Sequence, residues 1–283
     1  MQARVRAARR DDRAPLMSFI KDVWGGHDYI PRVWDEWMRD AKGEMFVVEL
    51  GGVPVGMNRV RYLEDGSAWF EGARVHPDFR GRGLATMLGE NSMRVARAKG
   101  ARVFRLTSGS TNRPAHRQIA KIAFEEVARF SVYEPDEEKR LNPAGGAMKV
   151  GTAGFAEALR LLRGSREYTL GAGVFWHDWS AASLTPKVVR RLVEEGAVWR
   201  SGEAIAAARE GGEGGETWEQ VCFIGGPPSG AVRLVKSLMG RRRRVSERWV
   251  FVPQGSPVIH SLREEGYRRH FSMVLFERRA AKG

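Results

Sequence analysis

The sequence predicts a mixed α+β protein made of two domains, and three observations support this prediction. The chain has 283 residues, and a typical domain takes roughly 150. In the first half, three consecutive strand patterns lie between helical patterns, which is typical of one sheet flanked by helices. A similar order of patterns recurs in the second half. We therefore expect two domains, each with a central, mostly antiparallel mixed sheet flanked by helices.

The first half begins with one strand and two helices. Val5–Ala8 is expected as a short strand, and Ala14–Val23 has the apolar spacing of a helix that Asp11 or Asp12 can cap. A second helix is expected behind Pro31, because proline suits a first helical turn and apolar residues recur after it at helical spacing.

Three antiparallel strands follow, joined by two turns that contain glycine. We expect the strands at Glu44–Leu50, Val53–Leu63 and Ala68–Val75, with turns at Gly51–Gly52 and Asp65–Gly66. The period then becomes helical again, and the remaining expected elements are a helix at Gly83–Lys99, a strand at Arg102–Thr107 and a helix at Arg113–Ile122.

The segment Glu134–Gly154 is rich in charge, proline and glycine, which is typical of a linker. We place the boundary near Asn142, so that residues 1–141 form the first domain and residues 142–283 the second. Two short echoes support a divergent duplication: His27–Tyr29 resembles His177–Trp179, and Ala123–Phe124 resembles the later Gly266–Tyr267. The expected second-half elements are a strand ending near Ile224, a helix at Gly230–Met239, a strand at Arg248–Val252, a helix at Pro257–Glu264 and a strand at Phe271–Phe276.

Composition excludes several classes of protein. Hydrophobic residues make up 42% of the chain and charged residues 29%, as in a folded globular protein. Met1–Arg10 carries four arginines and no apolar run, and no apolar stretch approaches about 18 residues, so we expect a cytoplasmic protein without a membrane partner. The single cysteine, Cys222, predicts neither an internal disulfide nor a metal site.

The charge of the chain favours an anionic partner. The net charge is +13, and 38 of its 47 basic residues are arginines. Phosphates of a nucleotide cofactor, nucleic acid, an acidic small molecule or a membrane surface would all fit, and arginine richness can also reflect genome composition or a hot habitat. The densest run, Arg241–Arg244, is typical either of a nucleic-acid patch or of a helix end whose dipole it complements.

The most informative stretch is Val75–Thr86, between a predicted strand and a predicted helix. Backbone N–H groups at a helix start lack helical partners, the helix dipole is positive there, and glycines let a diphosphate approach the main chain. The spacing Arg80-x-x-Gly83-x-Ala85 differs from a Walker loop and from a dinucleotide G-x-G-x-x-G fingerprint. We therefore predict an anion site that belongs to neither an ATPase nor a dehydrogenase.

Here the sequence resembles the GNAT family of acetyl-CoA-dependent N-acetyltransferases. Arg80, Gly83 and Ala85 match its Arg/Gln-x-x-Gly-x-Gly/Ala signature, and a strand ending in V-x-P precedes the loop. About 30 residues further on, an Asn-x-x-Ala motif precedes a helix ending in Ala123–Phe124, like the N-x-x-A…G-F of the family. The resemblance covers roughly residues 3–135. It implies a GNAT-type domain that binds acetyl-CoA and transfers its acetyl group to an amine.

The resemblance also assigns cofactor contacts. Backbone amides of residues 82–86 would hold the CoA diphosphate, while residues 73–75 would pair with the pantetheine arm like an added strand. A main-chain amide of that strand would polarise the thioester carbonyl. The predicted cofactor-binding residues are Ala73, Val75, Arg80, Gly81, Arg82, Gly83, Leu84, Ala85, Thr86 and Asn112.

For the proton transfers we expect two catalytic residues. An ammonium group must lose a proton before it attacks, and Glu71, on the strand before the loop, is the candidate base, directly or through water. The family often has a tyrosine as general acid, but Ile119 occupies the matching position in this sequence. Either CoA leaves as a thiolate without help, or another group serves, and we name Tyr133 first and His116 second.

The acceptor pocket is expected between the first two helices. His27 and Tyr29 lie there, and this stretch, together with Glu71–Val75, resembles the histidine N-acetyltransferase group. That resemblance implies a free amino acid or similar small amine as acceptor, with Arg74 or Arg59 pairing its carboxylate. The alternative is that the aromatic residues of this stretch are only core.

In the second half, residues 225–231 occupy the place of the phosphate loop. Pro227 and Pro228 remove two N–H donors and the arginine anchor is missing, so we predict one CoA per chain and a degenerate second GNAT-like domain. The expected protein is a monomer or homodimer that acetylates a primary amine in a ternary complex, without metal. The alternatives are a CoA-binding sensor without turnover, an enzyme for protein N-termini or lysines, and a nucleic-acid-associated protein.

Overall fold

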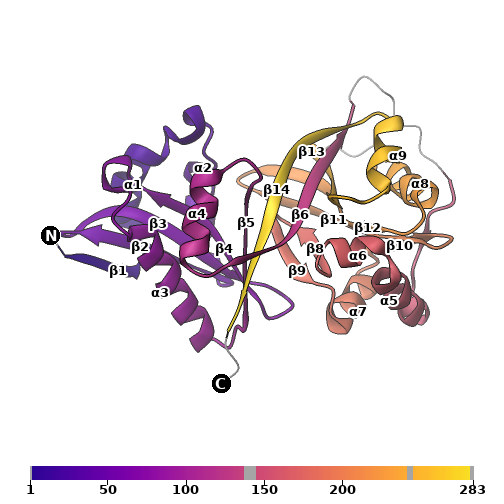
Figure 1. Ribbon diagram of the computed structural model, residues 1–283, viewed down its shortest axis with the longest axis horizontal. Helices are drawn as coiled ribbons and strands as arrows, with labels where there is room; N and C mark the ends of the chain where they lie inside the picture. Colours follow the sequence, from indigo (N-terminus) through magenta and orange to yellow (C-terminus); the bar gives the residue numbers. More distant parts are fainter. Residues whose placement is uncertain (1, 137–144, 241–244, 281–283) are drawn as a thin grey trace. The chain divides into compact units, whose positions relative to one another are not determined.

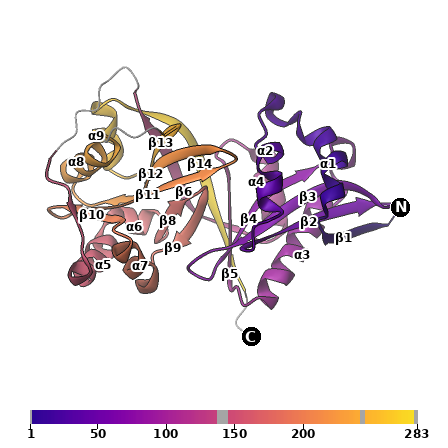
Figure 2. The ribbon, with the colours of Figure 1, turned by 180° about the vertical axis from the view of Figure 1, so that it is seen from behind.

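The computed structural model describes residues 2–136, 145–240 and 245–280. The chain divides into two compact units (Figures 1 and 2). Unit 1 contains the chain up to Leu106, Asn112–Glu125 and the chain from Phe276 onward, whereas unit 2 contains Thr107–Thr111 and Glu126–Leu275. The units are therefore not the contiguous halves 1–141 and 142–283 that the sequence predicts. The predicted boundary and the run Arg241–Arg244 both fall outside the described residues.

Unit 1 follows the order of elements that the sequence predicts, with ends that differ by a few residues. Its strands are β1 (Ala3–Ala7), β2 (Gly43–Leu50), β3 (Val53–Tyr62), β4 (Ala68–Val75) and β5 (Val103–Gly109), the last three residues of which belong to unit 2. Its helices are α1 (Arg13–Ile20), α2 (Ile30–Trp37), α3 (Leu84–Ala98) and α4 (Arg113–Lys121).

The sheet of unit 1 is mixed and mostly antiparallel, as predicted. Its strands lie in the order β1-β2-β3-β4-β5. The first three pairings are antiparallel, and β4 with β5 is parallel. The parallel step follows because α3 connects β4 to β5 and returns the chain to the starting end of the sheet.

Helices cover both faces of this sheet. Apolar side chains of α1 and α2 form one core cluster with Met45 and Val47 of β2 and Met57 of β3. The next residue, Asn58, points to the opposite face, because side chains alternate along a strand. There its Nδ2 donates to Ser92 Oγ of α3 over 2.8 Å. The sheet therefore separates α1 and α2 from α3 (Figure 1).

Unit 2 has a similar order of elements, with an additional pair of strands and an additional helix before its three-strand run. Its strands are β6 (Glu125–Pro135), β7 (Met148–Lys149), β8 (Val174–His177), β9 (Ser180–Ser183), β10 (Val198–Ser201), β11 (Ala204–Glu213), β12 (Glu216–Gly225), β13 (Glu247–Pro253) and β14 (Tyr267–Arg279). Its helices are α5 (Phe155–Gly164), α6 (Arg166–Leu170), α7 (Pro186–Glu194), α8 (Pro228–Met239) and α9 (Val258–Glu264).

The main sheet of unit 2 is also mixed. Strands β7, β10, β11 and β12 pair antiparallel in that order, and β12 then pairs with β13 in parallel. The helices α8 and α9 pack on this sheet around a core that includes Val221, Leu234, Val250 and Leu262. The predicted elements of the second half are all present, and β14 is longer at both ends than the predicted strand Phe271–Phe276.

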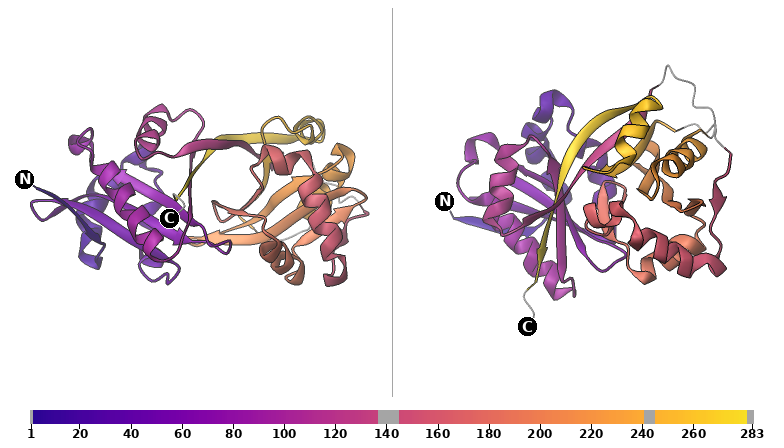
Figure 3. Two further views of the ribbon diagram at one scale, coloured as in Figure 1. Left: turned by 60° about the horizontal axis from the view of Figure 1, so that its bottom comes forward. Right: turned by 45° about the vertical axis from the view of Figure 1, so that its right-hand side comes forward.

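The strands β6 and β14 explain why the units are not contiguous halves. β6 follows α4 of unit 1 but pairs with β13 of unit 2, from Val250 opposite Tyr133 to Pro253 opposite Phe130. β14 runs beside β6 through unit 2 (Figure 3), and its end lies in unit 1, where Ala280 N donates to Arg102 O of the chain before β5. Strand pairing joins residues far apart in the sequence, so a linker signal near Asn142 does not reveal it.

Candidate functional site

The connection from β4 to α3 is the exposed loop that the sequence predicts, residues 76–83. Gly81 and Gly83 have φ of +79° and +77°, a left-handed conformation that glycine adopts without strain. A Cβ at either position would meet no heavy atom of the described chain within 4 Å. The two glycines therefore serve backbone conformation and leave the main chain open to a ligand.

The loop is held in shape by its own side chains. The Nε of Arg80 donates to the carbonyl oxygen of Val75 over 3.2 Å, and the backbone N of Asp78 donates to His76 Nδ1 over 3.3 Å. The ring of His76 lies between those of Phe19 and Phe79, with centroid distances of 4.9 and 5.3 Å. Arg80 thus anchors the loop to the end of β4.

The start of α3 suits an anion. The backbone bond from Met87 N to Gly83 O is the first of the helix, so the amides of Leu84, Ala85 and Thr86 precede it. The first turn of α3 contains no acidic residue, and Gly83 caps it. Exposed Arg80 and Arg82 add positive charge beside the positive end of the helix dipole.

The strand β4 has an open edge beyond its first two residues. Its parallel pairing with β5 is confined to Ala68 opposite Phe104 and Trp69 opposite Arg105. The segment that carries Ala73 and Val75 continues past that pairing, with Ala73 exposed. Backbone donors and acceptors on this edge can pair with an extended amide-containing ligand.

A bulge interrupts β4 on the way to the loop. The register with β3 shifts between Met57 and Arg59, and Gly72 on β4 has a φ of +66°. A Cβ on Gly72 would lie 2.8 Å from Cζ3 of Trp37, so the indole ring of this α2 residue packs directly over the bulge. A bulge of this kind re-aims the following amides of the strand.

Asn112 begins α4. Its Oδ1 accepts from the backbone N of Ala115 over 3.3 Å, which is a helix N-cap. The side chain is exposed and carries two further N–H donors. One turn into α4, Gln118 Nε2 donates to Thr86 Oγ1 of α3 over 2.8 Å. This hydrogen bond therefore connects the helix after the glycine loop, α3, with the helix that begins at Asn112, α4.

Glu71, the predicted base, is held in an ion-pair cluster. Its Oε1 accepts from Arg59 Nη1 over 2.8 Å, and its Oε2 lies 3.3 Å from Arg61 Nη2. The side chain keeps 12% of its surface exposed. Neither partner was visible from the sequence, because both are on the neighbouring strand.

The assignment of Tyr133 as general acid is not supported by its surroundings. Tyr133 is 1% exposed and belongs to the apolar core of unit 2, with residues of α8 and α9. Ile119 is buried as well, on α4. His116, one turn earlier on α4, is half-buried with its ring 5.1 Å from that of Phe276. Of the two named alternatives, only His116 lies in unit 1 with the loop and Glu71.

The stretch His27–Tyr29 lies where the acceptor pocket is predicted. His27 is exposed, whereas the side chain of Asp28 is fully buried and accepts from Arg74 Nε over 2.6 Å. The guanidinium of Arg74 lies 5.9 Å from the ring centre of Tyr29. The structure thus brings Tyr29 and Arg74 together, and Asp28 of the same stretch fixes the arginine.

The corresponding connection in unit 2 is short and closed. Only Gly226 and Pro227 separate β12 from α8. The N–H of Gly226 donates to Glu167 Oε2 over 3.1 Å, and the other oxygen of this 1% exposed carboxylate accepts from Ser256 Oγ. A Cβ on Gly230 would lie 2.8 Å from that of Ala204, so the β10–β11 turn covers the start of α8.

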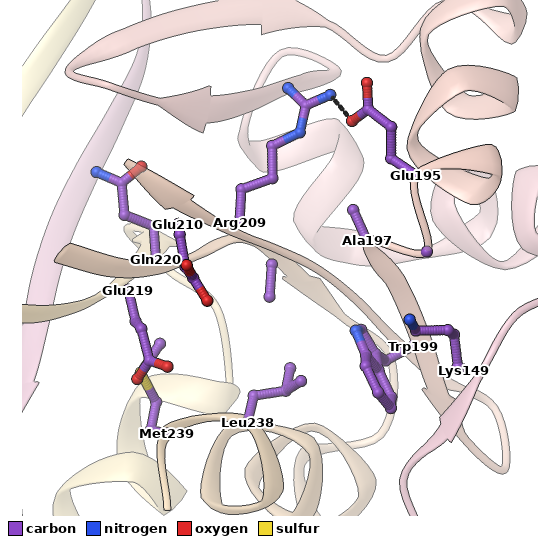
Figure 4. Close-up of a pocket in the computed structure, with 12 residues that line it drawn as sticks. Lys149, Glu195, Ala197, Trp199, Arg209, Glu210, Glu219, Gln220, Leu238 and Met239 are labelled. Carbon is purple, nitrogen blue, oxygen red and sulfur yellow. Dashed lines mark hydrogen bonds and ion pairs between the residues drawn. The ribbon is translucent and has the colours of Figure 1, made fainter. Parts of the chain in front are cut away.

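A cavity of about 320 Å³ in unit 2 lies elsewhere (Figure 4). It is bordered by Leu238 and Met239 at the far end of α8, a helix whose 12 residues span about 18 Å. Arg209 beside it is bound to Glu195, and Glu219 to Arg248. The cavity therefore contains none of the predicted site residues, and its Arg209, Glu195 and Glu219 side chains are paired within the protein.

None of the helices in residues 2–136, 145–240 and 245–280 is long and apolar enough to cross a membrane. Over the same residues, no group of three His, Cys, Asp or Glu side chains is arranged to hold a metal ion.

Sequence comparisons agree with this geometry. Residues 10–124 match the model of the acetyltransferase (GNAT) family. Similar proteins include a histidine N-acetyltransferase of Oreochromis niloticus, 30% identical over 82 residues that cover 29% of this chain and 24% of that protein. An uncharacterized N-acetyltransferase of Methanocaldococcus jannaschii is 30% identical over 141 residues, covering 43% of this chain and 60% of the other. The chain thus spans about a quarter of the matched histidine N-acetyltransferases.

Solved structures match nearly the whole chain. A GCN5-related N-acetyltransferase from Sphaerobacter thermophilus superposes with a TM-score of 0.63 at 15% identity, over 98% of this chain and 95% of the other. A second such structure, from Kribbella flavida, gives a TM-score of 0.50 at 16% identity, over 98% and 72%. These likenesses concern the fold. Residues 10–124, which contain the glycine loop and β4, match the acetyltransferase (GNAT) family and are a domain of that family.

Proposed function

We propose that this chain is an acetyl-CoA-dependent N-acetyltransferase that acetylates the primary amine of a small molecule by direct attack in a ternary complex. The observation that carries this proposal is that a glycine loop before α3 directly follows the part of β4 that continues past its pairing with β5, as far as the described residues show. The first fits a diphosphate and the second an extended amide arm, and acetyl-CoA contains both.

The residues present fit acetyl-CoA. The amides of residues 82–86 and the side chains of Arg80 and Arg82 would hold the diphosphate, because the loop is exposed and offers space above both glycines. Ala73 and Val75 would pair with the pantetheine arm, and Asn112 would contact it with its N–H donors. Bound there, acetyl-CoA supplies the thioester whose acetyl group the amine receives.

The chain itself supplies positioning and proton transfer. A main-chain N–H beyond the Gly72 bulge would donate to the carbonyl oxygen as negative charge develops on it. Glu71, 12% exposed, would accept the ammonium proton through a water molecule. Tyr133 has no part in this scheme. The thiolate of CoA leaves unaided or takes a proton from His116, and no covalent intermediate with the enzyme is required.

We further propose a free amino acid or a similar small amine as acceptor. Its support is the similarity to histidine N-acetyltransferases and the placement of Tyr29 and Arg74 beside β4. Arg74 would pair the acceptor carboxylate while Asp28 holds its Nε. Arg59 is unsuited to that task, because it is 2% exposed and bound to Asp40 and Glu71.

The test is a thermal-shift titration with acetyl-CoA, CoA and ATP, followed by thiol release with amino acids, polyamines and peptides. We expect both CoA species to stabilise the protein, ATP to have no comparable effect, and an amino acid to give the fastest release. No shift at millimolar acetyl-CoA would refute the proposal. A shift without thiol release from any amine would instead support a CoA-binding sensor. The buried Ile119 at the usual tyrosine position is the observation that favours this alternative.

The choice between His116 and an unaided thiolate needs a separate experiment. In a His116→Gln variant, loss of the alkaline limb of the kcat pH profile would assign the proton to His116. An unchanged profile would favour the unaided thiolate. The same variant should bind acetyl-CoA as the parent protein does.

A further inference from the structure

A buried arginine lies directly behind the candidate base. Arg59 on β3 is opposite Glu71 on β4 in the strand register. It is 2% exposed, although arginine is almost never fully buried unless it is paired. Its Nη1 donates to Glu71 Oε1 over 2.8 Å, and its Nη2 donates to Asp40 Oδ2. One guanidinium therefore bridges two carboxylates.

The protein encloses this guanidinium in a slot of three walls. The indole of Trp37 forms one wall, 4.7 Å from the guanidinium carbon to the ring centre. The backbone at Gly43 forms the second, since a Cβ there would lie 2.8 Å from Arg59 Nε. Asp40 closes the third, and its own carboxylate is fixed because Oδ1 accepts from Lys42 N over 2.9 Å. The slot therefore matches the planar shape and the charge of a guanidinium group.

The same tryptophan joins the slot to the reacting strand. Trp37 packs over Gly72, at the bulge directly after Glu71, and its ring also contacts that of Tyr29 at 5.8 Å. The guanidinium, the indole and the bulge are therefore in continuous contact. Movement of Arg59 would be transmitted both to the carboxylate and to the backbone that follows it.

We propose that Arg59 is a positioning residue, which acts through Glu71 by holding its carboxylate in one orientation toward the acceptor. This inference rests on the proposed function of Glu71. A stacked arginine that bridges two carboxylates has a geometry that lysine does not reproduce. Loss of Arg59 would also leave the partly buried carboxylates of Asp40 and Glu71 without their shared cation, which disfavours the present arrangement.

The first experiment is a double-mutant cycle of Arg59→Lys and Glu71→Gln in the full chain. We expect Arg59→Lys to lower kcat by about 10- to 100-fold, with the KM for acetyl-CoA within about twofold of the parent, because a displaced reacting group costs this much. In the Glu71→Gln background the same change should cost less than about twofold, since interacting residues are not additive. Additive losses would overturn the proposal.

The second experiment is chemical rescue. In Arg59→Ala, millimolar guanidinium chloride should restore part of the lost kcat, because the slot of Trp37, Asp40 and Gly43 is left vacant. Sodium chloride at the same ionic strength should not. Rescue would support the proposal, whereas equal effects of the two salts would contradict it. If Arg59→Ala does not fold, as judged by the acetyl-CoA thermal shift, the lysine cycle decides alone.

The matched control is Arg105→Lys. Arg105 is likewise 2% exposed and bridges two carboxylates of unit 1, Asp65 and Glu277, at 2.8 Å each, but neither belongs to the site. It should lose thermal stability and keep kcat within about twofold. An equal kcat loss in both lysine variants would mean general destabilisation and overturn the proposal. A parent protein without thiol release refutes the proposed function. A fully active Glu71→Gln variant refutes the base and with it the positioning role of Arg59, but leaves the acetyltransferase activity standing.

Discussion

The two connections between a sheet and its following helix differ in this molecule, although three antiparallel strands precede the helix in each unit. In unit 1, residues 76–83 separate β4 from α3, and two glycines with positive φ leave the backbone open. In unit 2, residues 226–227 separate β12 from α8, and the buried carboxylate of Glu167 accepts a hydrogen bond from the N–H of Gly226.

The comparison shows how the starts of α3 and α8 differ as candidate anion sites. The helix dipole is present in both units, but in unit 2 a protein carboxylate already takes an amide of the short connection, two prolines lack N–H groups, and a turn covers the helix start. A helix start therefore becomes a ligand site only where its amides remain exposed. This difference supports the proposal of one CoA per chain.

The largest effect is expected when one glycine is changed in each connection. Gly83→Val should weaken acetyl-CoA binding by more than about 100-fold, because a β-branched residue is strained at positive φ and fills the space of the ligand. Gly226→Val should leave this affinity unchanged and lower the melting temperature, since a Cβ there would lie 2.6 Å from Glu203 O. Calorimetric titration and thermal melting measure both. Equal affinity in Gly83→Val would remove the loop from the site.

Glu71→Gln tests the chemistry of unit 1 apart from its binding. We expect kcat to fall by about 100-fold, the usual contribution of a general base, while the affinity for acetyl-CoA stays within about twofold of the parent. Steady-state thiol release and calorimetry give the two values. Unchanged turnover would show that Glu71 is only a partner of Arg59.

Glu167→Gln tests the closure in unit 2. The amide cannot offer acceptors to both Gly226 N and Ser256 Oγ without placing its own N–H₂ group against one of them. We expect a loss of about 1–3 kcal/mol in the free energy of unfolding, measured by denaturant titration, and an unchanged stoichiometry of one acetyl-CoA per chain. A second equivalent bound by this variant would contradict the closure.

Acid should weaken a contact of unit 1 that lies away from the site. Burial raises the pKa of Asp12, but hydrogen bonds from the Arg6 guanidinium and the Arg9 amide outweigh it and hold the pKa below its usual range. A depressed pKa in the folded protein means stability that is present above the unfolded value and is lost as the pH falls through the folded value. Asp12→Asn should therefore destabilise the protein at pH 7, and the difference should shrink in acid. A constant difference between the two melting curves would disprove this.

The smallest effect is expected for Tyr133→Phe. The ring stays in the core of unit 2, and loss of the hydroxyl should change kcat by less than about twofold, far below the 100-fold expected of a general acid. Thiol release with the best acceptor measures it. A loss of 100-fold would return Tyr133 to the catalytic residues.

Local patterns carried most of the correct predictions. The alternation of Val53–Tyr62 and the glycine turns beside it predict the strands of unit 1, because side-chain periodicity and turn conformation are local properties. The glycine loop is local too, since Gly81 and Gly83 need only their own φ angles to form it. The echo of His27–Tyr29 in His177–Trp179 does not mark equivalent places, because the first stretch lies between α1 and α2 and the second at the turn from β8 to β9.

What depended on distant partners could not be read along the chain. Tyr133 follows the family motifs closely enough to suggest a catalytic role, yet β6 carries it into the core of unit 2. Arg59 resembled a free cation for a substrate carboxylate until the fold placed Asp40 and Glu71 on either side of it. Burial and ion pairing are set by contacts between separate elements, and sequence spacing does not report them.

The sequence by itself determined the mixed sheet, the order of its elements and the glycine loop, because periodicity, turn chemistry and backbone conformation act over a few residues. Only the tertiary structure decided that β14 ends in unit 1, that Glu167 closes the second connection, and that Arg59 stands behind Glu71. The physical reason is that strand pairing and buried charges join residues from distant parts of the chain, and their energies are set when those parts pack together.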